Sequence, residues 1–254
     1  MRKLIWPLCL MTAGILSACG LLLRGAADEP APSSSDPPES TPAAHTDLYR
    51  EGIDTEEVLA AFSEAVLHAE YSSGKGDASL VQKWGKPILY YIHGAYAEED
   101  LRILQDFFRE LNTIPGFPGI EEAPDESGAN LDIGFYGADE FNDEFGDAIA
   151  HEVADGAMQY WYYNKSNVIY RGRVGYRTDT EQKTRSSVLL EEIVNVLGFN
   201  DSVTREDSII YQYGSHIEEL SEMDWLLIRL LYHKDIRAGM DAESCTETLR
   251  RLYH

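Results

Sequence analysis

The sequence predicts a single domain of the α+β class, and three observations support this prediction. Residues 86–96 are β-branched and aromatic, as buried strands are, and residues 129–137 alternate apolar with other side chains. Amphipathic patterns, in which apolar residues recur about every 3.6 positions, indicate helices before and after these strands. The predicted order is helix, strand, helix, strand, strand, helix, helix, which is typical of a mixed domain.

The first half of the domain contains two predicted helices and two predicted strands. A helix is predicted over 54–71, where Asp54 and Glu57 have the spacing of a capping box and apolar residues continue along one face. The strand at 86–96 and a helix at 98–112 follow. After turn residues at 115–119, the second strand is predicted at 129–137.

The second half is less regular before its last helices. Residues 138–164 are acidic and aromatic, and their pattern does not specify one structure type. Residues 166–179 are expected to be extended, with glycines as bends or bulges. Two helices are then predicted, at 187–197 and at 221–233, where Ser221 and Asp224 form another capping box.

The N-terminal segment is not expected to belong to the domain. Residues 1–18 combine two basic residues, an apolar stretch and small residues, which is the layout of a signal peptide. Leu16-Ser17-Ala18-Cys19 resembles a bacterial lipobox, which implies that Cys19 becomes the lipidated N-terminus. An ordinary signal peptide and a short transmembrane anchor are the alternatives. About 20 apolar residues are needed to span a bilayer, and Pro7 interrupts this stretch.

The remaining composition sets the domain boundaries and limits the partners. Residues 19–46 are rich in Pro, Ser and Ala and are predicted to form a flexible linker, which leaves 47–254 as the domain. The domain contains one cysteine, Cys245, so no internal disulfide is expected. The formal net charge of −23 argues against nucleic acid as a partner, and leaves solubility or cationic partners as explanations.

Residues 189–202 read LLEEIVNVLGFNDS and carry the main question of function. An apolar stripe on this helix is expected to be buried, while Glu191 and Asn195 lie one turn apart on the same ridge. The segment resembles the active-site helix of zincin peptidases of the metzincin branch. The resemblance places Gly198 at the helix-ending bend, and Glu192 at the position of the catalytic glutamate. It places Glu191, Asn195 and Asp201 where the three zinc-binding histidines belong.

Two downstream segments extend this resemblance in the correct order. Ser208-Ile209-Ile210-Tyr211 resembles the methionine turn beneath the metal, with Ile210 in place of methionine. Residues 220–224, LSEMD, resemble the start of the last helix. The segments EEIVNVLG, NDS, DSII, RLLY and RAGM also resemble a bacterial secreted family, number 2927 among the domains of unknown function. This closer resemblance covers about 165–245, implies a zincin-like fold, and brings no established activity.

The residues at the ligand positions argue against zinc, and no cofactor is expected. Zinc prefers nitrogen and sulfur donors, whereas Glu191, Asn195 and Asp201 offer oxygen and amide groups. A hard cation such as calcium is an alternative. Without a metal, crowding of the carboxylates would raise one carboxyl pKa and leave an acid/base pair. The favoured interpretation is structural, with Glu191 and Asn195 hydrogen-bonded to neighbouring backbone.

Other candidate features have simpler explanations. His151-Glu152-Val153-Ala154-Asp155 fits a short metallopeptidase motif, but Gly156 follows at once and no third ligand is evident. The remaining histidines His68, His93, His216 and His233 are expected to be surface or structural residues, and Asp139, Asp143 and Asp147 to form a solvated helix face. The aromatic run at 160–164 is expected to be buried, with a ligand groove beside an edge strand as the alternative.

The predicted function is non-catalytic. The protein is expected to be a lipid-anchored pseudo-peptidase of the cell envelope that binds a peptide or protein in the old substrate cleft. This cleft would lie between an edge strand at 168–177 and the helix at 187–197. The alternative is a hydrolase that uses Glu192 as the general base, with a non-zinc metal or none.

Overall fold

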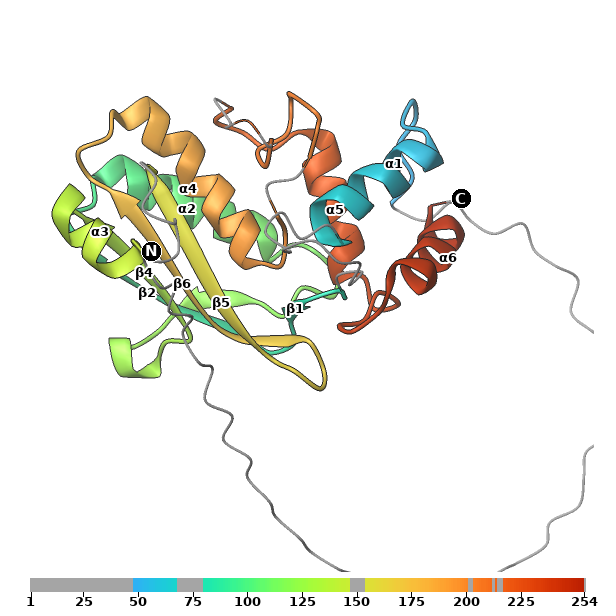
Figure 1. The fold of residues 1–254 in the computed structure, drawn as a ribbon, viewed down its shortest axis with the longest axis horizontal. Coiled ribbons are helices and arrows are strands. Elements are labelled where there is room, and N and C mark those ends of the chain that lie inside the picture. Colours follow the sequence, from blue (N-terminus) through green and yellow to red (C-terminus); the bar gives the residue numbers. More distant parts are fainter. Residues whose placement is uncertain are drawn as a thin grey trace, which may run out of the picture. The chain divides into compact units, whose positions relative to one another are not determined.

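The computed structural model describes residues 48–67, 80–146, 154–200, 203–211, 213 and 217–253 (Figure 1). The predicted signal peptide, Cys19 and the linker 19–46 lie outside these residues. The same holds for Asp201, His68, His151, Glu152, His216 and Asp147. None of the helices in the described ranges has the length and apolar character needed to cross a bilayer.

The centre of the domain is a six-stranded sheet with the order β1-β6-β4-β2-β3, with β5 paired to β6. The strands are β1 (Lys83–Trp84), β2 (Ile88–Gly94), β3 (Ile120–Glu122), β4 (Leu131–Tyr136), β5 (Gly156–Tyr163) and β6 (Val168–Arg177). β5 is antiparallel to β6, and the other pairs are parallel. The sheet is therefore mixed, as predicted, and mostly parallel.

The position of the edge strand differs from the prediction. Residues 168–177 were expected to form the edge, but β6 lies inside the sheet between β4 and β5. The edge on this side is β5, and the aromatic run that the sequence analysis placed in a segment of uncertain structure lies within it. The prediction failed because the alternation of side chains reports which face of a strand is buried, not which strands are its neighbours.

Six α-helices accompany the sheet in the described part of the chain. They are α1 (Thr55–Phe62), α2 (Glu98–Leu111), α3 (Ala138–Phe145), α4 (Gln182–Val196), α5 (Glu222–Tyr232) and α6 (Ala242–Leu252). A π-helical turn, Ser63–Leu67, extends α1, and a 3-10 turn forms at Glu126–Gly128. Figure 1 shows α2 and α4 side by side along the sheet, and α1, α5 and α6 grouped beyond the end of α4.

The two faces of the sheet are covered by different helices. Tyr176 on β6 donates a hydrogen bond to the carbonyl of Leu189 on α4, so its side of the sheet faces α4. Arg173 and Gly175 point the opposite way, since side chains alternate along a strand. They contact α3: Arg173 donates to the carbonyl of Glu144 at 2.9 Å. The large apolar core therefore lies between the sheet and α2 and α4.

The predicted helices and strands agree with the structure where local signals were strong. The helix expected at 98–112 is α2, and the capping box of Ser221 and Asp224 opens α5. Asp54 caps α1, but it accepts from Glu56 N and not through a box with Glu57. The helix expected at 187–197 begins earlier, at Gln182.

Several elements were not predicted. α6 and the short strands β1 and β3 carried no clear signal in the sequence, and α3 was indicated only by the spacing of Asp139 and Asp143. In α6 only Cys245, Leu249 and Leu252 are buried, so its apolar stripe is too thin to stand out among polar residues.

Candidate functional site

The bend predicted at Gly198 is present, immediately after α4. Gly198 has a φ of 115°, a region that glycine enters without a steric penalty. A Cβ added at this position would overlap the backbone oxygen of Gln82. Glycine is therefore required here for two independent reasons: the positive φ, and the close approach of the chain before β1.

Buried donors satisfy the last carbonyls of α4. Trp84 donates its indole N–H to the carbonyl of Val196 at 2.8 Å, and Tyr232 donates its hydroxyl to that of Leu197 at 2.8 Å. The backbone N–H of Gly198 donates to the carbonyl of Asn195 at 2.9 Å. β1 and α5 thus fix where the helix ends and where the chain turns.

Glu192, the candidate general base, lies between α4 and the edge strand. A Cβ built on Gly156, the first residue of β5, would lie 3.0 Å from Cγ and 3.0 Å from Oε1 of Glu192, and would overlap Val188. Helix and strand can approach this closely only because residue 156 has no side chain. The Glu192 side chain is half-buried at this junction.

Acidic residues of α2 and α4 act electrostatically on a buried tyrosine of β6. Tyr176 is fully buried, and this burial raises its pKa well above the usual value; the negative charges of Glu192, Asp100 and Glu191 raise it further. Tyr176 therefore stays protonated and donates its hydrogen bond to Leu189. Its single hydroxyl proton is engaged by Leu189, so Tyr176 ties β6 to α4 and does not act as a phenolate.

The residues at the positions that resemble zinc-ligand positions do not fit zinc. Asn195 is only 2% exposed, Glu191 is half-buried, and Asp201 lies outside the described residues. Neither Glu191 nor Asn195 supplies the nitrogen or sulfur donors that zinc prefers. Across the described ranges, no three His, Cys, Asp or Glu side chains form a group that could hold a metal. Glu191 and Asn195 are therefore not assigned as zinc ligands.

The turn at Ser208–Tyr211 is anchored by Asp224 of α5. Ser208 donates its hydroxyl to Oδ1 of Asp224 at 2.6 Å, and the N–H of Ile209 donates to Oδ2 at 3.0 Å. Ile210, in the position of the methionine, is 1% exposed and belongs to the main core. The N–H of Ser221 also donates to Oδ2 of Asp224, at 2.9 Å, which is the capping box. One carboxylate thus holds both the turn and the start of the helix.

A buried ion pair joins α2 and α4, and it was not predicted from the sequence. Asp100 is fully buried and accepts from Nε of Arg185 at 3.0 Å, while Gln182 donates to the same oxygen at 2.7 Å. Arg185 also donates to the carbonyl of Thr180 at 2.7 Å. The pattern that could have revealed the pair is the N3 position of Asp100 in α2, where its second oxygen caps Ala97 N at 2.8 Å.

The other candidate residues are dispersed. Nε2 of His93 lies 3.2 Å from Asp132 on the sheet face opposite α4, and His233 is the C-cap of α5. Asp139 and Asp143 are exposed on α3, as the solvated-face interpretation requires.

The interpretation of the aromatic run as buried packing is wrong for most of its members. Trp161 is 39% exposed and Tyr163 is 54% exposed, and Tyr162 is also exposed. Only Tyr160 is largely covered, where it donates to Oε1 of Gln82 at 2.7 Å. A residue run of this kind can be buried or exposed depending on whether another strand or helix covers it, and this strand is at the edge.

A family model described as "Protein of unknown function (DUF2927)" matches residues 55–251. The chain belongs to this family. The match extends from α1 to α6, well beyond the segment 165–245 on which the resemblance was first recognised. No curated protein matches the chain.

The structure gives a physical role to one DUF2927 segment, RAGM at 237–240. The N–H of Gly239 donates to the carbonyl of Val81 at 2.8 Å, and the N–H of Val81 donates to the carbonyl of Met240 at 2.9 Å. This exchange ties the segment before α6 to the residue that leads into β1. In this chain the segment therefore links the start of α6 to the start of β1.

Proposed function

We propose that this protein is a bacterial envelope lipoprotein, anchored through Cys19, whose degenerate zincin-like domain binds an extended peptide or protein segment without hydrolysing it. The observation that carries the proposal is the edge position of β5. Among the described strands, β5 pairs with β6 alone, so its other side offers backbone donors and acceptors. An extended chain can add to such an edge by main-chain hydrogen bonds.

The zincin-like assignment is supported by the arrangement around α4. The helix ends at a glycine bend, and the turn at Ser208–Tyr211 follows it, held by the capping aspartate of α5. An antiparallel edge strand lies against the same helix, beside Glu192. These are the features expected of a substrate cleft whose zinc ligands have been replaced.

The exposed side chains of β5 supply contact area for a partner. Trp161, Tyr162 and Tyr163 are exposed on the strand, and Tyr163 stacks on Tyr170 of β6 with ring centroids 4.4 Å apart. Large exposed aromatic residues are enriched among the residues that dominate binding energy. A partner that pairs with the backbone of β5 would cover these rings.

Selection of peptides from a random displayed library against the mature protein tests the binding proposal. A selected peptide should slow amide hydrogen exchange in residues 156–163. Replacement of Trp161 and Tyr163 by lysine should weaken its affinity by about tenfold or more, because lysine on an edge strand opposes pairing. Tyr213→Lys, which changes an aromatic residue outside the sheet, should not alter the affinity. Protection that appears only outside β5 would contradict the proposal.

A hydrolase that uses Glu192 is the second candidate, and the half-buried position of Glu192 beside β5 favours it over other enzyme classes. Metal analysis of the mature protein, with melting in the presence and absence of a chelator, separates the two. Stoichiometric metal and a chelator-sensitive melting temperature would contradict the degenerate site. The variant Glu192→Gln should keep peptide binding if the function is non-catalytic.

A further inference from the structure

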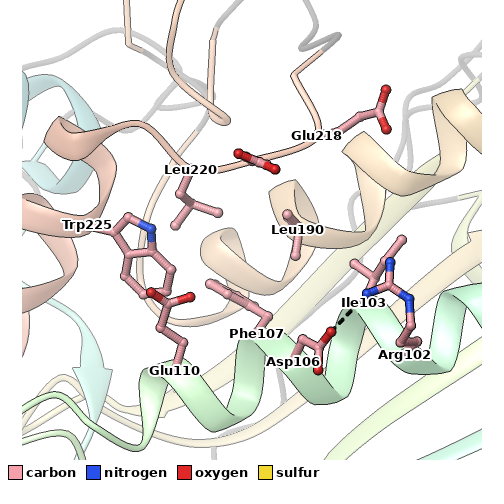
Figure 2. Close-up of a pocket in the computed structure, with 10 residues that line it drawn as sticks. Arg102, Ile103, Asp106, Phe107, Glu110, Leu190, Glu218, Leu220 and Trp225 are labelled. Carbon is pink, nitrogen blue, oxygen red and sulfur yellow. Dashed lines mark hydrogen bonds and ion pairs between the residues drawn. The ribbon is translucent and has the colours of Figure 1, made fainter.

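We propose a second binding site, formed between α2, α4 and the start of α5, that takes a basic side chain of a peptide together with an adjacent apolar group. The site is a pocket with a volume of about 410 Å³ (Figure 2). This volume is at the lower end of the range for ligand pockets and suits a group the size of one or two side chains.

Side chains from three helices and from one connecting segment form the apolar part of the pocket lining. Its apolar side chains come from α2, α4, α5 and the segment before α5, and are Ile103, Phe107, Leu190, Leu220 and Trp225. The rings of Phe107 and Trp225 lie with centroids 5.5 Å apart and tilted by 57°. Trp225 is only partly buried, so its ring remains accessible to a group in the pocket.

The charges at the rim favour a cation. Glu110, Glu218 and Glu219 line the pocket and are exposed, and none of them forms an ion pair within the described part of the chain. Three carboxylates around one small pocket create a negative potential in the space between them.

The cation in the wall does not cancel this charge. Arg102 donates to Glu99 and lies 2.9 Å from Oδ2 of Asp106, as the dashed line in Figure 2 marks. Asp106 is also paired with Arg109 at 2.9 Å. Arg102 and Asp106 therefore form part of a closed set of ion pairs along α2, and the three glutamates remain uncompensated.

The chemistry of the occupant follows from this combination. A guanidinium or ammonium group can meet the glutamates at the rim while its alkyl stem covers Phe107, and the face of Trp225 attracts cations. Anionic groups are repelled, and a purely apolar group leaves the carboxylates without a partner. The pocket thus fits a lysine or arginine residue with an apolar neighbour, which also gives a specific role to part of the negative charge of the chain.

This site is independent of the edge-strand proposal. No residue of β5 lines the pocket. Failure of one proposal therefore leaves the other unchanged. Peptide pairing is measured by hydrogen exchange in residues 156–163, whereas binding at this site is measured by the NMR signal of Trp225.

The test uses the full chain and two matched probes. N-acetyl-phenylalanyl-arginine amide carries the cation and an apolar neighbour, and its citrulline analogue has the same shape without the charge. The indole N–H signal of Trp225, assigned with Trp225→Phe, is followed by NMR as each probe is added. We expect the arginine probe to shift this signal with a Kd at least about tenfold lower than that of the citrulline probe.

Two triple variants with the same change in net charge separate a site from general attraction. Glu110→Gln, Glu218→Gln and Glu219→Gln together should weaken the arginine probe by about tenfold or more. Glu121→Gln, Glu126→Gln and Glu140→Gln, at exposed positions outside the pocket, should change the Kd by less than about twofold. Equal weakening by both triple variants, equal binding of both probes, or the absence of a shift at Trp225 would overturn the proposal.

Discussion

Ser208 and Asp224 form a hydrogen bond of 2.6 Å in the protein interior, where they are 1% and 3% exposed. The same carboxylate accepts from the backbone of Ile209 and caps α5. The turn that resembles a methionine turn is therefore held in place by a polar contact to α5. Both partners of this contact are side chains of the described residues, so the turn is held by the protein's own groups.

Asp224→Ala should lower the free energy of unfolding by about 3–5 kcal/mol, because it leaves two buried donors without an acceptor and removes a cap. Urea unfolding measures the change. Ser221→Ala, which removes the hydroxyl that accepts from the N–H of Asp224 in the same capping box, should cost only about 1 kcal/mol. Equal losses in the two variants would show that the contacts to Ser208 and Ile209 contribute nothing.

Gly198→Ala should destabilise the protein by more than about 3 kcal/mol or prevent folding, since a Cβ would overlap the Gln82 backbone. Gly52→Ala is the matched control. Gly52 has a φ of 88° but no atom within 4 Å of an added Cβ, so only the conformational cost of about 1 kcal/mol applies. Thermal melting of both variants compares them, and similar melting temperatures would contradict the close approach.

Arg185→Met should cost about 3–5 kcal/mol, because Asp100 would remain buried without its cation. Arg251→Met, which breaks an exposed pair with Asp235, should cost less than about 1 kcal/mol. Both are measured by denaturant unfolding at neutral pH. A small loss for Arg185→Met would mean that Gln182 and the backbone of Ala97 suffice to stabilise the carboxylate.

The buried thiol of Cys245 should make the free energy of unfolding depend on pH in the alkaline range. Burial, followed by the charge of Asp241, raises the pKa of its thiol to about 11. Because the pKa is higher in the folded state, its contribution to stability is complete below the unfolded pKa of about 8.5 and is lost as pH rises towards 11. The wild-type protein should therefore lose about 2–3 kcal/mol relative to Cys245→Ala between pH 8.5 and pH 11.

Urea unfolding under reducing conditions at several pH values measures this difference. Burial lowers the pKa of Lys83 to about 8, and the charge of Cys245 partly opposes this shift. The comparison therefore reports the thiol together with its coupling to Lys83. Parallel stability curves for the two proteins across this range would contradict a buried, protonated thiol.

The sequence by itself determined the features that arise from local interactions. The periodicity of α2, the buried strands β2 and β4 and the capping box of α5 depend on residues within a few positions of each other. The bend at Gly198 was implied by the resemblance, and the structure contains it. The sequence also showed that the positions resembling zinc-ligand positions carry acidic and amide side chains, and this remains the argument against zinc.

Only the tertiary structure decided which strand lies at the edge, which aromatic residues are exposed, and where Glu192 meets β5. It also revealed the second role of Asp224, the pair Asp100–Arg185 and the pocket beside Trp225. Each of these depends on segments far apart in the chain. Side-chain alternation and helical period specify which face of an element is buried, but the partner that covers that face is set by packing of the whole domain.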